Sequence, residues 1–366
     1  MQKTRNGLNE IYFLSAITCL ILVGVQVFEM FALKEAFSEI ASFSHTSGRF
    51  SIAAFAVIVG AFVFHKVGNQ QFEKKSFSRS VISKMILLVA LWGSFYSVLK
   101  MIEGESLVTG WGALPFNVVV DEAFYTLSFV IAVLQFLLLY PLLKLVESKT
   151  GWALMLAASG LITYFALNGY FSGTTTVQAV LEHPAFLTNW IFFFVFGSFL
   201  AHYGVKVQML AKKLDWVGFA IMLVLVGLTV VYLNGGMTEG GWMMVAIPLV
   251  TISLLVIYPF VERVVLLDIF LAAIGKSAFG IYLALPVVVF AFSTVMPEFM
   301  FGSEYSVLVY SVVLGTTLFI SRVIEMFPMK MEFKRYRLSK SYGANSSNGA
   351  CHHPVYVNKC REKALS

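Results

Sequence analysis

The sequence predicts an all-α integral membrane protein with about ten transmembrane helices and both termini in the cytoplasm. Three observations predict this fold class. Hydrophobic residues make up 58% of the 366 residues and charged residues only 13%, whereas soluble domains carry about 25% charge. The apolar residues occur in long uninterrupted runs, and the connections between the runs alternate in charge. With a mean hydropathy of +0.81, this composition excludes a soluble globular enzyme.

Ten apolar segments are long enough to cross a bilayer as helices, which requires roughly 20 residues each. They are continuously apolar and too long for the strands of a membrane barrel. The segments are Ile11–Leu33, Phe50–Val67, Ile82–Met101, Ala123–Leu145, Trp152–Tyr170, Phe186–Tyr203, Trp216–Leu233, Trp242–Val261, Phe270–Val295 and Tyr305–Val323.

The basic residues indicate how these spans are oriented. Most of the 26 lysines and arginines lie at the N-terminus, in the connections that follow even-numbered spans, and in the C-terminal region. Basic connections stay in the cytoplasm, so residues 1–326 form a membrane domain with both ends inside. The outer connection between the first two spans is expected over Lys34–Arg49. Residues 327–366 are basic and then rich in serine, asparagine and glycine, which predicts a disordered cytoplasmic tail.

The net charge and the cysteines indicate which partners and metals to expect. The net charge of +6 follows from this topology, so the lipid bilayer is an expected partner and nucleic acid is not. Three cysteines do not make a disulfide framework. The tail group of Cys351, His352, His353 and Cys360 matches no zinc template, so no metal site is expected.

Ionisable or strongly polar side chains inside spans are costly and often functional. Gln26 and Glu29 are three residues apart, so they share a face of the first span. They form a polar pair facing a cavity, or Glu29 lies at the outer interface and Gln26 bonds a neighbouring helix. His65 lies near the cytoplasmic end of the second span, and histidine is the natural general base near neutral pH. The alternative interpretation is that His65 has a structural or interfacial role.

Two further pairs lie at span ends. Asp121 and Glu122 enter the fourth span from outside, where they could bind acceptor sugar hydroxyls, stabilise a cation, or simply complement the helix dipole. Arg79 and Lys84 approach the third span from the cytoplasm. A basic pair there could bind the phosphates of a nucleotide-like donor, or serve only as positive-inside anchoring.

Four local patterns, in order, resemble the membrane acyltransferase-3 family. Phe124–Phe129 with Gln135–Leu143 is similar to the family's fourth-span segment, and Ile191–Leu200 resembles its sixth. Ile274–Leu283 is similar to its ninth-span "IGKxSFGIYLxH" signature, and Ser80–Tyr96 resembles the basic entry to the third span. The resemblance extends over nearly all of the predicted spans. Within the family, the sequence most resembles the exopolysaccharide branch, such as the intercellular-adhesin type.

This resemblance implies that an acyl group, acetyl or succinyl, passes from acetyl-CoA or succinyl-CoA to a hydroxyl of a cell-surface or secreted polysaccharide. The family's chemical signature in the first span is an arginine followed eleven positions later by a histidine. Here Ser15 and Gln26 align with those positions. Glutamine does not exchange a proton near pH 7, and serine does not replace a guanidinium in binding phosphate.

Three interpretations therefore remain open. The protein is a divergent acyltransferase in which His65, Glu29 or another group is the base, or a catalytically inactive homologue in polysaccharide export and assembly. The third interpretation is a small-molecule transporter. The first two imply a bacterial inner-membrane location, a polysaccharide acceptor, and synthase or export proteins as further partners.

Overall fold

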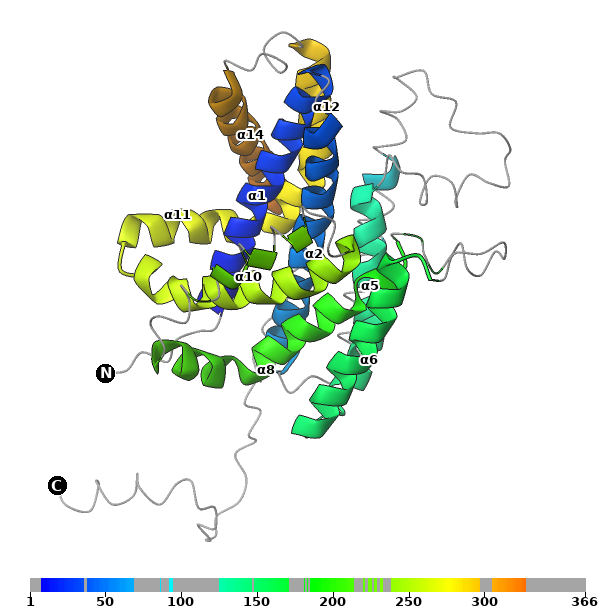
Figure 1. The fold of residues 1–366 in the computed structure, drawn as a ribbon. Coiled ribbons are helices and arrows are strands. Elements are labelled where there is room, and N and C mark those ends of the chain that lie inside the picture. The colour runs from blue at the N-terminus through cyan, green and yellow to red at the C-terminus, as the bar shows by residue number, and fades with distance from the viewer. Residues whose placement is uncertain are drawn as a thin grey trace, which may run out of the picture. The chain divides into compact units, whose positions relative to one another are not determined.

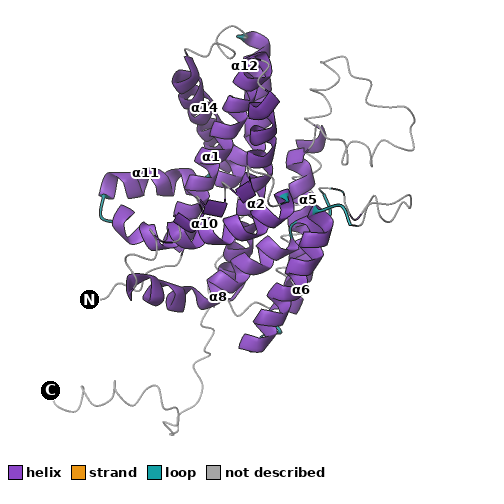
Figure 2. Ribbon diagram, in the orientation of Figure 1, coloured by secondary structure: helices purple, strands orange, loops and turns teal. Residues whose placement is uncertain are grey.

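The computed structural model describes most of the predicted membrane domain and none of the predicted tail. The described residues are 8–35, 38–68, 125–146, 148–170, 185–213, 238–296 and 305–326, with isolated positions at 86, 92–94, 181, 183, 220, 223–225, 227–228 and 231–232. Every regular element in this part of the chain is helical (Figures 1 and 2). The all-α prediction is therefore confirmed for the described residues.

The helices follow the predicted apolar runs. They are α1 (Leu8–Glu35), α2 (Ser38–Gly68), α5 (Tyr125–Leu143), α6 (Lys149–Leu167), the 3₁₀ turn η2 (Leu187–Asn189), α8 (Ile191–Lys213), α10 (Glu239–Val261), α11 (Val265–Lys276), α12 (Ala278–Val295) and α14 (Ser306–Met326). Five described helices are long and apolar enough to cross a membrane, and three more have shorter apolar stretches. The predicted spans 82–101 and 216–233 lie largely outside the described residues, so the total of ten and the orientation stay predictions.

Many large apolar side chains face outward from these helices. Leu138, Leu161, Leu266 and Phe319 are each more than half exposed. Soluble monomers rarely carry so much outward apolar surface, whereas lipid tails solvate it without penalty. Outward leucine and phenylalanine are therefore expected of a helical bundle in a bilayer.

The first two helices pack as an antiparallel pair. Ile11 and Leu14 of α1 pack with Ile58 and Ala61 of α2, so positions whose numbers add to about 72 lie level with one another. Helices α12 and α14 also pack together, and α11 packs on α1. In Figure 1, α10 and α11 run across the direction of α1, α2, α12 and α14.

Helix α2 begins earlier than the hydropathy pattern indicates. The predicted outer connection Lys34–Arg49 is largely helical, because α2 starts at Ser38 and α1 continues to Glu35. Hydropathy marks the part of a helix that lies in the bilayer, while polar residues beyond it still continue the helix in water. The prediction that this segment is an external loop was wrong.

The ninth predicted span is two helices. Ser277, with φ −94° and ψ 5°, separates α11 from α12. Helix α14 bonds two carbonyls at this break. Ser321 Oγ donates to Ser277 O at 3.1 Å, which also accepts from Ile281 N of α12, and Arg322 Nη2 donates to Ala273 O at 3.1 Å. Because Ser277 N donates to Ile274 O instead of Ala273 O, the Ala273 carbonyl needs another donor, and the Arg322 bond supplies it.

Two glycines allow α2 and α8 to cross in backbone contact. A Cβ added at Gly197 would lie 1.9 Å from Val57 O, and a Cβ added at Gly60 would clash with Phe194 O. Ser198 Oγ lies 3.2 Å from Gly60 O at the same crossing. Small residues permit close approach of membrane helices, so this crossing sets the distance between the two helices.

Candidate functional site

The two positions that align with the family's chemical pair both lie on α1. Eleven residues correspond to about three helical turns, so Ser15 and Gln26 share a face about 16 Å apart along the axis. Ser15 is only 4% exposed, and its hydroxyl donates to Ile11 O at 2.7 Å. The hydroxyl proton of Ser15 is therefore donated within its own helix.

The three candidate bases do not form one cluster. Gln26 is partly buried on α1, and Glu29 lies about one turn further along the same helix, with its side chain outside the described residues. His65 is partly buried near the end of α2. By the antiparallel register, Gln26 lies level with about residue 46, which is roughly 28 Å along the axis from His65 at 1.5 Å per residue. Gln26 and His65 therefore belong to opposite ends of the helix pair.

The other sequence-predicted site residues lie outside the described residues. These are the donor-side pair Arg79 and Lys84 and the acceptor-side pair Asp121 and Glu122. Their roles remain predictions.

A small cavity lies where α1, α2 and α10 meet. Its volume is about 20 Å³, which is enough for about one water molecule. It is lined by Leu14, Ile17, Thr18, Ile21, Phe50, Ser51, Ala54, Ile58, Ile247, Val250, Thr251 and Leu254. Of its three hydroxyls, that of Thr18 donates to Leu14 O at 2.9 Å. The cavity is too small to contain an acyl group.

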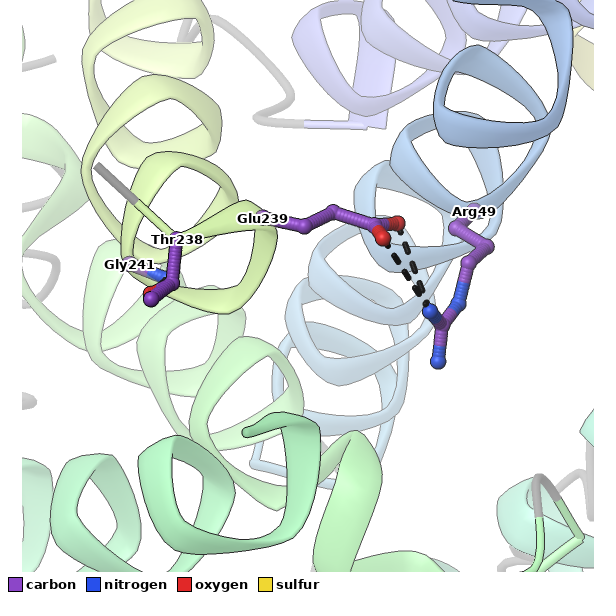
Figure 3. Close-up of polar contacts among 4 residues, drawn as sticks. All are labelled: Arg49, Thr238, Glu239 and Gly241. Carbon is purple, nitrogen blue, oxygen red and sulfur yellow. Dashed lines mark hydrogen bonds and ion pairs between the residues drawn. The ribbon is translucent and has the colours of Figure 1, made fainter. Parts of the chain in front are cut away.

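An ion pair connects α2 to the start of α10 (Figure 3). Arg49 Nη1 lies 3.3 Å from Glu239 Oε1 and 3.4 Å from Oε2. Thr238 caps α10 by accepting a hydrogen bond from Gly241 N at 3.2 Å, and Glu239 in the first turn complements the helix dipole. The pair links α2 to the first turn of α10, and both charged residues are predicted to lie on the outer side.

A cluster of four rings, Phe64, Tyr140, Trp152 and His202, joins α2, α5, α6 and α8. We refer to it as the aromatic cluster. The Phe64 ring lies edge-on to the other three, with centroids 6.2 Å from Tyr140, 5.6 Å from Trp152 and 5.5 Å from His202. The His202 ring stacks on Trp152 at 5.4 Å. His65 is the next residue after Phe64, so this candidate base lies beside the cluster in the chain.

Two polar atoms of the aromatic cluster are buried without a hydrogen bond to any described residue. They are the Tyr140 hydroxyl and the Trp152 indole nitrogen. Tyr140 is 5% exposed and Trp152 is 0% exposed. A buried donor left without a partner costs about 1–3 kcal/mol, and such groups call for an explanation.

Sequence reasoning missed both the ion pair and the aromatic cluster. Arg49 carried a signal, since it is one of few basic residues on the predicted outer side. Its partner Glu239 is 190 positions away, so the pairing could not be read from the chain. The ring cluster had no signal, because aromatic residues are 15% of the sequence and occur throughout it.

The segments that resemble the family's motifs have packing roles in this structure. The Gln135 side chain donates to Ala185 O at 2.9 Å and accepts from Leu187 N at 3.0 Å, which connects α5 to the turn before α8. A Cβ at Gly275 would clash with Tyr12 O of α1, and one at Gly280 would clash with Ser321 Oγ of α14. These residues specify helix contacts, so they can persist where the reactive pair does not.

Sequence comparison places the chain in a known family. The sequence profile of a family described as "Acyltransferase domain" matches residues 11–326, which is nearly all of the predicted membrane domain. No curated protein and no solved structure gives a significant match. Since the profile match covers well over half of the chain, this protein belongs to the membrane acyltransferase-3 family.

Proposed function

We propose that the protein transfers an acetyl or succinyl group from acyl-CoA to a hydroxyl of a cell-surface or secreted polysaccharide, in a bacterial inner membrane. The observation that carries this proposal is the family match over residues 11–326, because membrane acyl transfer is the family's general activity. The outward apolar side chains of the helices support a location in the bilayer.

The proposed reaction has three steps. A base accepts the proton of the sugar hydroxyl, the alkoxide oxygen attacks the thioester carbonyl, and the CoA thiolate leaves and is protonated. His65 and Glu29 are the proposed alternatives for the base, while Gln26 can only donate or accept a hydrogen bond beside the reacting groups. Arg79 and Lys84 are proposed to bind donor phosphates, and Asp121 and Glu122 to bind acceptor hydroxyls.

A second candidate function is an inactive homologue that acts in polysaccharide export or assembly. It is favoured by Ser15, whose buried hydroxyl bonds within α1 where the family resemblance implies a donor-binding arginine. The two functions differ in a measurable product, because only the first creates an ester.

The proposal is tested by deleting the gene and quantifying base-labile esters on the purified polysaccharide by proton NMR. The parent strain and a complemented strain are the references. Loss of esters with normal polymer yield supports acyl transfer. Unchanged esters would refute acyl transfer to that polymer, and loss of the polymer itself would favour export or assembly.

The residue assignments are tested in the complemented strain. Arg79→Ala combined with Lys84→Ala is expected to lower ester content if the pair binds the donor; an unchanged content would remove this assignment. His65→Ala and Glu29→Gln discriminate the two candidate bases, and Gln26→Ala tests the hydrogen-bonding role. Gly315→Ala is the matched control, since no described atom lies within 4 Å of the added methyl group.

A further inference from the structure

We infer that the aromatic cluster binds the pantetheine arm of the acyl donor, with the Tyr140 hydroxyl and the Trp152 indole N–H donating hydrogen bonds to its carbonyl oxygens. This inference rests on the proposed function, because it names the part of the donor that this surface recognises. It begins with the two buried donors that find no partner among the described residues.

The two donors define the complementary ligand group. An indole N–H can only donate, and a phenol hydroxyl donates more readily than it accepts. The group that satisfies both is therefore an acceptor such as a carbonyl oxygen. The edge-on ring of Phe64, 5.6 Å from Trp152, offers the indole at best a weak N–H–π contact.

The surroundings favour a neutral acceptor over a phosphate. Tyr140 and Trp152 lie among rings, and placing a charged group there would carry a large desolvation penalty. The pantetheine arm has amide carbonyls and ends in the thioester, all neutral, on a slim and largely apolar chain. Lys144 Nζ lies 5.7 Å from the centroid of the Tyr140 ring and is exposed, so a cation stands at the rim, where the donor's phosphates would lie.

The cluster also has a route of access. His202 is exposed, while Trp152, on which its ring stacks at 5.4 Å, is completely buried. Rotating an exposed side chain about χ1 is a fast and inexpensive motion. As the exposed member of the aromatic cluster, His202 is the side chain that a ligand would displace to reach the indole.

The position along the helices suits a donor that comes from the cytoplasm. Phe64, Tyr140, Trp152 and His202 lie within about two turns of the ends of four predicted spans, and all four ends are on the predicted cytoplasmic side. Acyl-CoA is a soluble donor that cannot cross the bilayer, so its arm must enter there. His65, Arg79 and Lys84 are predicted to lie on the same side.

The test measures binding to the purified protein in detergent by calorimetry, with acetyl-CoA, 4′-phosphopantetheine and adenosine 3′,5′-bisphosphate as probes. Tyr140→Phe and Trp152→Phe keep a ring and remove the donor. Each is expected to weaken acetyl-CoA and phosphopantetheine binding about tenfold and to leave the bisphosphate unchanged within twofold. Tyr310→Phe and Trp242→Phe are matched controls distant in sequence, expected to change no affinity more than twofold.

Thermal stability without ligand gives a second, independent readout. Removing a buried donor that has no partner is neutral or stabilising, so Tyr140→Phe is expected to melt at or above the wild-type temperature. Tyr310→Phe is expected to melt lower, because its hydroxyl donates to Leu20 O at 3.1 Å. A lowered melting temperature of Tyr140→Phe with unchanged affinity would show that the atoms are satisfied structurally, for example by water, and would overturn the inference.

The outcomes separate this inference from the proposed function. If the wild type binds acetyl-CoA and both variants bind it equally well, the inference fails and the function stands. If the variants weaken bisphosphate binding as much as acetyl-CoA binding, the cluster binds the nucleotide end of the donor and the inference fails. If phosphopantetheine binds and depends on both donors while no ester is ever formed, the inference stands and acyl transfer fails. If the wild type binds neither acetyl-CoA nor phosphopantetheine, the inference fails, and the ester measurement alone decides the function.

Discussion

The crossing of α2 and α8 gives the sharpest prediction about this fold. Gly197→Ala would place a Cβ 1.9 Å from Val57 O, whereas ordinary contact begins at 3.4 Å. The two backbones must separate by about 1.5 Å, and a gap of 0.5–1 Å already forfeits a quarter to a half of each dispersion contact. Overpacking of this kind costs about 1–3 kcal/mol or more, against about 1 kcal/mol gained in helix propensity.

The expected result is a protein less stable than wild type by about 2 kcal/mol, which lowers the melting temperature by about 4 °C or more. The assay is thermal unfolding of the detergent-solubilised protein, followed by tryptophan fluorescence and by retention of monodisperse protein. Gly315→Ala is the control, because no described atom lies within 4 Å of the new methyl group; only its propensity gain of up to about 1 kcal/mol remains.

The crossing also positions the aromatic cluster. Phe64 and His202 lie about one turn beyond Gly60 and Gly197, so a displaced crossing separates their rings. Gly197→Ala is therefore expected to lose affinity for acetyl-CoA together with stability. If Gly197→Ala melted at the same temperature as Gly315→Ala and the wild type, the close backbone contact would be refuted. The positioning of the aromatic cluster derived from that contact would be refuted with it.

Three further predictions concern the ion pair, the buried cysteine and Ser15. The Arg49–Glu239 pair, with side chains 28% and 30% exposed, is expected to show a coupling energy of no more than about 1 kcal/mol in a double-mutant cycle, and a coupling of several kcal/mol would contradict this. Cys19 is completely buried, so in a variant without the other two cysteines it should not react with maleimide until the protein is denatured; rapid labelling of the folded protein would show that its surroundings open. Ser15→Arg would bury a cation at a position only 4% exposed and should lower stability by about 3 kcal/mol or more, against about 1 kcal/mol for Ser15→Ala; wild-type stability of Ser15→Arg would show that this face accommodates the guanidinium typical of the family.

The existence of the helices followed from hydropathy alone. All eight predicted spans that fall within the described residues are helical. A segment in the bilayer core has no water beside it, so its backbone N–H and C=O groups must hydrogen-bond within the segment. Hydropathy did not predict where α2 begins. The twelve residues before Phe50 remain helical although they are too polar for the bilayer core.

The break at Ser277 could not be predicted locally. The residues from Phe270 to Val295 read as one apolar run, and two carbonyls at the break are bonded by Ser321 and Arg322, which follow more than 40 positions later. Pairings across such separations are properties of the packed bundle.

The candidate site was predictable only where a polar residue interrupted an apolar run. Gln26, Glu29 and His65 stood out as polar residues in apolar runs, but the register of α1 and α2 was needed to separate Gln26 from His65. The Tyr140 and Trp152 donors look like ordinary interfacial aromatic residues in the sequence. Their significance follows from burial without partners among the described residues, which only the packed structure provides.

The most direct test of the central claim is acyl transfer by the purified protein itself. The protein is reconstituted in liposomes with radiolabelled acetyl-CoA or succinyl-CoA and with polysaccharide from the deletion strain as the acceptor. We predict that base-labile label accumulates in the polysaccharide, and that empty liposomes give none. Label that stays entirely in acyl-CoA, with folded protein and intact acceptor, would contradict the acyltransferase account.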